Sequence, residues 1–505
     1  MSKNLASKAV SGIKWGSAST FANAVMQIGY TSVMARLLAP EAFGLVSIAG
    51  TILGFSGYFA NMGLSKAIIQ KEDITADNIR AAFTTSVALG IFFFLLTWII
   101  APFSAIYFKE PNVAPIVRVM GLVFLINGLS MTAISLLERE MRFKTIGIIE
   151  TSSYIFSYLV VGIILAYLDF GVWALVYASL MQSLTYALGA YFSVRHSVLP
   201  SFKWESFKPL FDYGSRMSLI SFMEYISANL PTVLIGRFLG THKLGLYSRA
   251  FMLVNLPMYQ LTRTLIKVAM PSYSRLQSDN EKLGKVYLSS ITLLAALIMP
   301  ICLGIMVAAP EIIRIVLGDQ WGESVPVLQV LALAIPMGFI TMFAGIVCDA
   351  KAILNPKIIL NILFIVVICV FFLLFRDYGL VGFAGAVLLG EFVRMLMYQQ
   401  IMHKELDLPH SKQLAIYMPG LINGVLVAVG IYIVSTVMRS AELPALAILI
   451  AQMATGAVLL LVLTLLFPHK LLRQELQIVF EKIGLQGKTD SYLHKIIQRT
   501  GLISE

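Results

Sequence analysis

Long runs of apolar residues, separated by short polar connections, repeat along the whole chain. Each run reaches the length of roughly 20 residues that an α-helix needs to cross the hydrocarbon core of a bilayer. The pattern predicts an all-α polytopic membrane protein. We expect fourteen transmembrane helices, two sets of six and a final pair, over 11–36, 42–66, 81–106, 113–137, 146–168, 171–194, 212–236, 245–271, 286–309, 324–348, 357–375, 380–402, 414–437 and 444–467.

A short motif occurs twice, about 200 positions apart, which indicates a duplicated unit. Residues 36–47 read RLLAPEAFGLVS and residues 237–248 read RFLGTHKLGLYS, with Arg, Leu, Gly, Leu and Ser in the same register. Residues 169–172 likewise match 377–380. Six spans per half is an even number, so both halves enter the membrane in the same orientation as parallel repeats. We therefore predict two parallel six-helix bundles around a central cleft, plus two C-terminal helices.

The predicted division of the chain follows these repeats. Residues 1–198 form an N-terminal lobe, 212–405 a C-terminal lobe and 406–468 the two additional helices. The segment 199–211 mixes aromatic and basic residues at helical spacing, which favours an amphipathic connector at the cytoplasmic interface over a plain polar loop. The tail 469–505 begins with an amphipathic helix too short and too charged to span. It either lies on the membrane or docks a partner, and the sequence does not separate the two.

Composition and charge support a membrane protein and exclude a nucleic-acid partner. The chain is 58% hydrophobic and 13% charged, whereas about a quarter of the residues are charged in soluble domains. The net charge of +11 comes mainly from Lys and Arg in alternate connections, the distribution that the positive-inside rule gives for cytoplasmic loops. The opposite connections hold only Arg36, Lys109, Arg237, Lys243, Arg314, Arg376 and Arg439. Both termini are therefore expected in the cytoplasm.

Motifs of enzymes and metal sites are absent from the sequence. Cys302, Cys348 and Cys369 lie inside apolar spans with no CxxC spacing, which is typical of small buried hydrophobic residues. The chain contains no GxxxxGK[ST] loop and no HExxH pair. We expect no enzymatic activity, no cofactor and no bound metal, with H+ or Na+ as the candidate coupling ion.

Charged side chains at membrane depth are costly and usually face a cavity or a partner. The candidate substrate-binding cations are Lys14, Arg118, Arg216, Arg249, Arg263, Lys267 and Arg394. Arg249, Arg263 and Lys267 share one face of the predicted helix 245–271. Snorkelling of these long side chains to the lipid headgroups is the alternative, which also applies to Arg118 and Lys14 near helix ends.

Two acidic residues are candidates for ion coupling. Glu224 is the deepest acid of the predicted helix 212–236, and it could equally be the structural partner of an arginine. Glu391 stands three residues before Arg394, so these two side chains could instead pair with each other on one helix face. Arg36 and Arg237 occupy equivalent external helix ends, which favours a structural role for both.

The segments SGIKWGS at 11–17 and ARLLAPEAFG at 35–44 resemble the polysaccharide transporter family, and the resemblance covers essentially the whole chain. It is most similar to the bacterial Wzx-type flippases for lipid-linked oligosaccharides. The resemblance implies transport of an undecaprenyl-diphosphate-linked oligosaccharide across the bacterial inner membrane by alternating access, for lipopolysaccharide or other cell-surface polysaccharide synthesis. Its implied partners are this substrate, membrane lipids, and a polymerase or other assembly proteins. The alternatives are a drug/cation antiporter of the multidrug/oligosaccharidyl-lipid/polysaccharide flippase superfamily, which includes the polysaccharide transporter family, and an assembly subunit that does not transport.

The topology can be tested with fused reporters. We expect a reporter after Lys203 to lie in the cytoplasm and one near Gly318 to lie outside, because six spans per half return the chain to its starting side. Alkaline phosphatase and fluorescent-protein fusions measure both locations. A reporter on the opposite side at either position would require an odd number of spans in one half.

Overall fold

The computed structural model describes residues 22–60, 68–69, 74–200 and 204–483, and the side chains of 58–60, 204–221, 263–264, 267–268 and 478–483 are outside that description. Within these ranges the chain forms helices and no β-strand. Eight of the described helical segments are long and apolar enough to cross a membrane. The predicted all-α polytopic fold is confirmed, whereas the count of fourteen spans stays a prediction.

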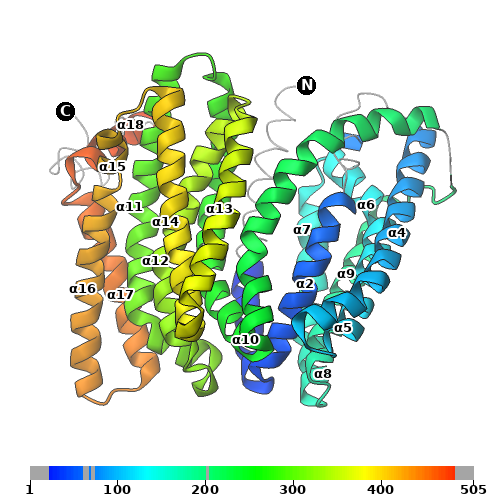
Figure 1. Ribbon diagram of the computed structural model, residues 1–505, viewed down its shortest axis with the longest axis horizontal. Helices are drawn as coiled ribbons and strands as arrows, with labels where there is room; N and C mark the ends of the chain where they lie inside the picture. The colour runs from blue at the N-terminus through cyan, green and yellow to red at the C-terminus, as the bar shows by residue number, and fades with distance from the viewer. Residues whose placement is uncertain (1–21, 61–67, 70–73, 201–203, 484–505) are drawn as a thin grey trace. The chain divides into compact units, whose positions relative to one another are not determined.

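The chain divides into two compact units, residues 1–249 and 250–505. Unit 1 begins with a helix over 22–37 and ends inside the long helix α10 (Figure 1). Its other helices are α2 (Pro40–Ala60), α4 (Ala76–Phe108), α5 (Val113–Met120), α6 (Leu122–Arg139), α7 (Phe143–Tyr154), the π-helical η1 (Ile155–Gly162), α8 (Ile163–Tyr167), α9 (Val172–Val194) and the first part of α10 (Trp204–Arg275).

Unit 2 packs α11 against α12 and α16, and α14 against α12 and α13, as Figure 1 shows for its antiparallel helices. Its helices are the end of α10, α11 (Asn280–Ile312), η2 (Ile313–Leu317), η3 (Asp319–Trp321), α12 (Ser324–Ala350), α13 (Leu354–Phe375), η4 (Arg376–Tyr378), α14 (Gly379–Leu406), α15 (His410–Ala415), α16 (Met418–Ser440), α17 (Ala445–Leu465) and α18 (Lys470–Ile483). The division of the chain into lobes 1–198 and 212–405 stays a prediction.

Each copy of the duplicated motif contains the break between two helices. In the first copy, the helix over 22–37 ends before the two non-helical residues 38 and 39, and α2 follows. In the second copy, Gly240 interrupts α10 with φ of 81° and ψ of 178°. The segment 169–172 and its counterpart 377–380 also have a similar backbone conformation. Gly171 has φ of 54° where α9 begins, and Gly379 has φ of 62° where α14 begins. The repeat seen in the sequence is therefore a structural repeat.

The two motif copies contact each other reciprocally inside unit 1. A Cβ atom on Gly44 would overlap the carbonyl oxygen of Thr241, and a Cβ atom on Gly245 would overlap that of Pro40. Gly44 and Gly245 are equivalent positions of the repeat, and so are Pro40 and Thr241. Only glycine permits backbones to approach so closely. The crossing of the two copies is thus symmetric at the level of the backbone.

Further contacts extend from this crossing along α2. The Tyr225 hydroxyl of α10 donates to the carbonyl oxygen of Thr51 at 2.7 Å. The Phe55 ring meets the Phe222 ring edge-on, with centroids 4.7 Å apart. At the crossing itself, Nδ1 of His242 lies 2.6 Å from Oε1 of Glu41, again at equivalent positions of the repeat. These contacts hold α2 against both parts of α10 that belong to unit 1.

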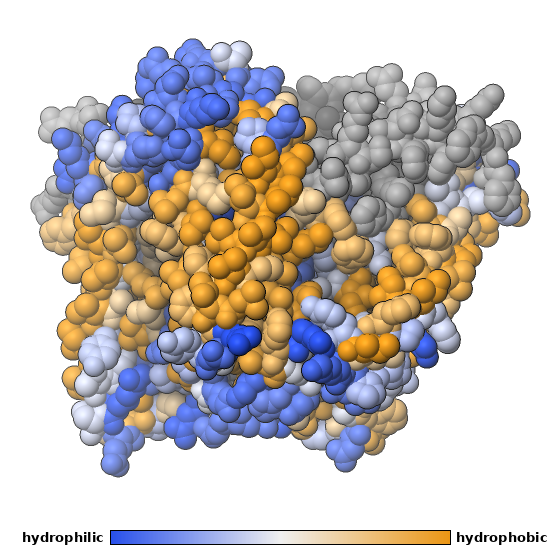
Figure 2. All heavy atoms as spheres, in the orientation of Figure 1, coloured by the Kyte–Doolittle hydropathy of each residue, from blue (hydrophilic) through white to orange (hydrophobic). Residues whose placement is uncertain are grey.

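The outward faces of the helices are apolar, as a bilayer requires. Figure 2 shows apolar side chains gathered over α13 and α14, between polar helix ends. Val366, Leu373 and Leu374 on α13 are among the large hydrophobic residues that are more than 40% exposed. Apolar exposure on this scale marks a membrane-facing or binding surface in ordinary proteins, and here it lies on helices long enough to span.

A polar cluster around the buried Glu311 holds α16 and α17 to α11 of the same unit. Arg439 of α16 donates from Nε and Nη2 to the two carboxylate oxygens of Glu311 on α11, at 2.7 and 2.8 Å. Gln452 of α17 donates to Glu311 at 3.0 Å and to Ser435 of α16 at 2.8 Å. Because lipid offers no competing hydrogen bonds, these contacts fix α16 and α17 beside α11.

The tail helix α18 packs against α11 of the same unit. Its Leu472 is buried, and Ser289 of α11 donates a hydrogen bond to Glu475. The predicted amphipathic helix is therefore present, and one of its faces lies on unit 2 itself.

The reciprocal glycine contact makes a prediction about stability. Gly44→Ala and Gly245→Ala should each lower the free energy of unfolding by about 1–3 kcal/mol, the usual cost of overpacking, and by similar amounts because the contacts are symmetric. Thermal melting of the purified protein measures both. Gly50→Ala on α2 is the matched control, because no atom lies within 4 Å of its added Cβ. Equal melting temperatures for Gly44→Ala and Gly50→Ala would contradict the close approach.

Candidate functional site

The side chains of four predicted cations lie outside the part of the chain that the structure describes. Lys14 lies outside the described residues, and so do the side chains of Arg216, Arg263 and Lys267. The backbones of the last three belong to α10. The predicted basic face of helix 245–271 is thus described only at Arg249, and the roles of these four residues stay predictions.

Arg249 lies among aromatic rings of unit 1. Helical rise places its Cα about 13 Å from the break at Gly240, and its guanidinium carbon lies 4.8 Å from the ring centroid of Phe43 on α2. It is also within electrostatic range of Tyr30 on the helix over 22–37. A desolvated cation–π contact contributes about 2 kcal/mol. Arg249 of α10 is therefore near aromatic rings of two other helices of unit 1.

Arg118 has a similar environment on another pair of helices. It lies on α5, and its guanidinium carbon is 5.1 Å from the ring centroid of Trp98 on α4. Trp98 is 49% exposed, so this contact faces the surface of unit 1. That position agrees with the predicted alternative, in which Arg118 extends toward the lipid headgroups.

Glu224 is an exposed side chain of α10. Its neighbour Tyr225 is bonded to Thr51 of α2, and Asn229 lies one turn further on and donates to the Tyr225 carbonyl oxygen at 3.0 Å. Glu224 is therefore anchored next to the contact between α2 and α10, and its proposed coupling role stays a prediction.

Glu391 and Arg394 form an ion pair in the middle of α14. Arg394 Nη2 is 2.5 Å from Glu391 Oε2, with side chains 22% and 14% exposed. The Arg394 guanidinium carbon also lies 4.8 Å from the Phe364 ring centroid of α13. On α12, Gly338 leaves room for the pair, since an added Cβ would lie 3.3 Å from Arg394 Nη2. The geometry therefore shows these two side chains paired with each other, and the coupling role of Glu391 and the substrate-binding role of Arg394 stay predictions.

Sequence reasoning missed two ion pairs between helices, each with one buried partner, because it counted their cations with the connections. Lys357 of α13 is 4% exposed, and its Nζ lies 2.7 Å from Oδ1 of Asp349 on α12. Arg439 was counted among the external cations, yet it binds Glu311. The presence of Asp349 and Glu311 within a turn of apolar spans was the available signal. In the part of the chain that the structure describes, no three His, Cys, Asp or Glu side chains come together as a metal site.

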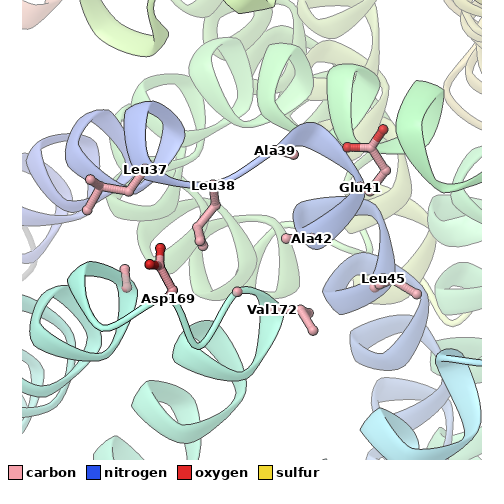
Figure 3. Close-up of a pocket in the computed structure, with 10 residues that line it drawn as sticks. Leu37, Leu38, Ala39, Glu41, Ala42, Leu45, Asp169 and Val172 are labelled. Carbon is pink, nitrogen blue, oxygen red and sulfur yellow. The ribbon is translucent and has the colours of Figure 1, made fainter.

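A pocket of about 330 Å³ opens in unit 1 between the first motif copy and the segment 166–172. Figure 3 shows Leu37, Leu38 and Ala39 along one side and Asp169 and Val172 along another, with Glu41 at its edge. Its lining is mainly apolar and includes two carboxylates, Glu41 and Asp169. None of the predicted cations that the structure describes is among its lining residues.

The sequence matches a family of known proteins over more than half of its length. The family model described as "Polysaccharide biosynthesis protein" matches residues 33–326. An "Uncharacterized membrane protein in cps region" of Klebsiella pneumoniae is 25% identical, over 77% of this chain and 81% of that protein. The "Lipopolysaccharide biosynthesis protein WzxC" of Escherichia coli (strain K12) is 24% identical, over 65% of this chain and 67% of that protein.

Two solved structures share the fold. A lipid II flippase MurJ in an inward closed conformation aligns with a TM-score of 0.67 at 13% identity, covering 93% of this chain and 99% of that chain. An inward-facing multidrug resistance MATE family transporter of the MOP superfamily aligns with a TM-score of 0.59 at 18% identity, covering 77% and 96%. The fold is therefore common to flippases and drug transporters, and it does not by itself separate them.

The ion pair of α14 generates a testable prediction. Glu391→Gln or Arg394→Gln alone leaves one buried charge without its partner and should cost about 3–5 kcal/mol of stability. The double variant Glu391→Gln, Arg394→Gln should recover most of that loss, as measured by melting of the purified protein.

The export activity of the double variant then separates the two roles of this pair. Normal export with recovered stability means that the pair is only structural. Lost export in a stable protein means that the charges act in transport. Additive destabilisation in the double variant would contradict the ion pair itself.

Proposed function

Because the chain belongs to the polysaccharide biosynthesis protein family, we propose that it is a flippase for an undecaprenyl-diphosphate-linked oligosaccharide. It moves this lipid from the cytoplasmic to the periplasmic leaflet of a bacterial inner membrane by alternating access of its two predicted lobes. Both termini lie in the cytoplasm. The names of the relatives and the fold shared with a lipid II flippase support this proposal.

The observation that carries the proposal is the family match over residues 33–326, and Arg249 is the described cation that we propose for the headgroup. A diphosphate on a lipid stem brings negative charge into a medium of low dielectric, where a cation stabilises it strongly. Arg249 offers a planar guanidinium suited to phosphate oxygens, and Phe43 and Tyr30 around it are uncharged. The Phe43 ring stabilises the guanidinium, and we propose that this guanidinium binds the headgroup of the lipid.

Energy for net transport comes from an ion gradient rather than from ATP. The chain lacks a phosphate-binding GxxxxGK[ST] loop, and H+ or Na+ is the proposed coupling ion, with Glu224 and Glu391 as its sites. The flipped oligosaccharide passes to a polymerase or another assembly protein on the far side of the membrane.

The drug/cation antiporter of the same superfamily is the weaker candidate. A site for a hydrophobic cation needs a carboxylate at membrane depth that keeps its charge available. The buried Glu391 is already paired with Arg394 at 2.5 Å. The shared fold with a MATE transporter supports only the architecture.

Deletion of the gene followed by lipid analysis tests the proposed function. We expect undecaprenyl-linked repeat units to accumulate on the cytoplasmic leaflet and the surface polysaccharide to be lost. Unchanged glycan with increased drug sensitivity would instead identify the antiporter. Leaflet location can be measured by the accessibility of the lipid-linked sugar to a lectin in oriented vesicles.

Arginine variants restored to the deletion strain test the role of the cations. A hydrogen bond to a charged group contributes about 1.5–3 kcal/mol, which corresponds to roughly a 10- to 100-fold loss of export for Arg249→Ala and for Arg263→Ala at normal protein levels. Lysine at either position should rescue only partly, because the guanidinium fork is lost. The control is Arg314→Ala, since Arg314 is 65% exposed and binds Asp319. Export at the level of this control for both alanine variants would contradict a role in substrate binding.

A further inference from the structure

The contact between residues 40–44 and residues 241–245, which we call the motif crossing, relates equivalent positions of the repeat to each other. Glu41 contacts His242, its own equivalent 201 positions later, and the two glycine contacts of the crossing are reciprocal. Parallel repeats are related by an axis along the membrane normal. A residue touches its own equivalent only near such an axis, because the axis passes midway between the two. The motif crossing therefore lies on the line along which a cleft between the two repeats would run.

The contact between the two copies continues inward along α2 and the first part of α10. The Tyr225 hydroxyl donates to the Thr51 carbonyl oxygen at 2.7 Å, and the Phe55 and Phe222 rings meet with centroids 4.7 Å apart. Helical rise places Phe55 about 16 Å from Gly44, which is about half of the hydrocarbon thickness of roughly 30 Å. The two helices thus close the half of the membrane on the side where the sequence places the external connections.

The ion pair of the motif crossing differs from that of a permanent helix contact. The side chains of His242 and Glu41 are 44% and 47% exposed, and an ion pair that water already reaches contributes little to stability. In unit 2, by contrast, Glu311 is 5% exposed and binds both Arg439 and Gln452, so separating those helices would leave a buried charge without its partners. The fit of the motif crossing depends on shape, and its ion pair breaks and re-forms at low cost.

Each copy also has a break in its helix at the motif crossing. Residues 38 and 39 are non-helical in the first copy. In the second copy Gly240 has φ of 81°, and an added Cβ there would meet no atom within 4 Å, so backbone conformation rather than packing requires glycine. Ends of elements are where hinges absorb changes of φ and ψ. Both copies therefore have a joint next to the contact.

We propose that the motif crossing is the external gate of the carrier, closed in this structure, and that it opens by separation of α2 from α10. This inference rests on the proposed function and names the contact that must open for the oligosaccharide to leave on the external side. Because the contact lies on the axis of the repeat, a headgroup that moves between the halves is blocked while the two backbones touch. Attraction between Glu41 and His242 helps the gate to close again after release.

Cysteine cross-linking tests the gate in the deletion strain, with the full-length chain in which Cys302, Cys348 and Cys369 are replaced by alanine. Glu41→Cys with His242→Cys should retain export within twofold of this parent protein, because the exposed pair contributes little. A short bifunctional thiol reagent that joins the two cysteines should then lower export at least tenfold, and cleavage of the cross-link by a reductant should restore it. Export is measured as newly made surface polysaccharide, and lipid-linked repeat units should accumulate while the cross-link is present.

The matched control is Arg314→Cys with Asp319→Cys. These side chains form an ion pair of 2.9 Å near another connection that is predicted to be external, and both lie within one short segment of unit 2. Cross-linking this pair should leave export within twofold. A second gate pair, Thr51→Cys with Asn229→Cys, joins side chains 3.5 Å apart deeper in the same contact, and it tests the gate if the first pair does not insert into the membrane.

Unchanged export from a protein that is fully cross-linked between positions 41 and 242 overturns the proposal, and so does unchanged export after cross-linking of positions 51 and 229. Mass spectrometry of the purified protein measures the extent of cross-linking. Failure of the proposed function has a different result: the parent protein without any cross-link then restores no surface polysaccharide, and the deletion strain accumulates no lipid-linked repeat units.

Discussion

The close approach of two backbones at Gly44 and Gly245 is the constraint on which the rest of unit 1 depends. Each glycine faces a carbonyl oxygen of the other motif copy, so neither position has space for a side chain. This contact fixes α2 beside α10, and Arg249 follows Gly245 by only one helical turn. The position of the guanidinium over Phe43 is thus set by the backbone crossing. The proposed binding of the substrate by Arg249 therefore depends on two positions, 44 and 245, where only glycine fits.

The elements of the fold could be predicted from sequence because their signals are local. Apolar runs of membrane-spanning length gave helices, and the repeated motif gave equivalent helix breaks before α2 and at Gly240. That the two copies touch could not be predicted, because sequence similarity shows that two segments are alike and not that they are neighbours. The pairing of Glu41 with His242 has the same origin, since the two residues are 201 positions apart in the sequence.

The contacts of the candidate site also include some that the sequence predicts and some that it does not. Glu391 and Arg394 were recognised as a pair because a spacing of three on a helix is sufficient to bring them together. Lys357 and Arg439 were assigned to exposed connections, because the positive-inside rule counts where a cation lies along the chain and ignores what it touches. Their partners Asp349 and Glu311 lie on other helices.

Four described arginines differ in the groups that their guanidinium contacts, and this difference bears on the proposed cargo. Arg394 and Arg439 each face a carboxylate, so each pair contributes little net charge to its surroundings. Arg249 and Arg118 instead lie over the rings of Phe43 and Trp98. An aromatic face attracts a guanidinium through its quadrupole and leaves the positive charge in place. In the proposed flippase, the Phe43 ring orients the Arg249 guanidinium for an anionic headgroup, and this cargo distinguishes the flippase from an antiporter for cationic drugs.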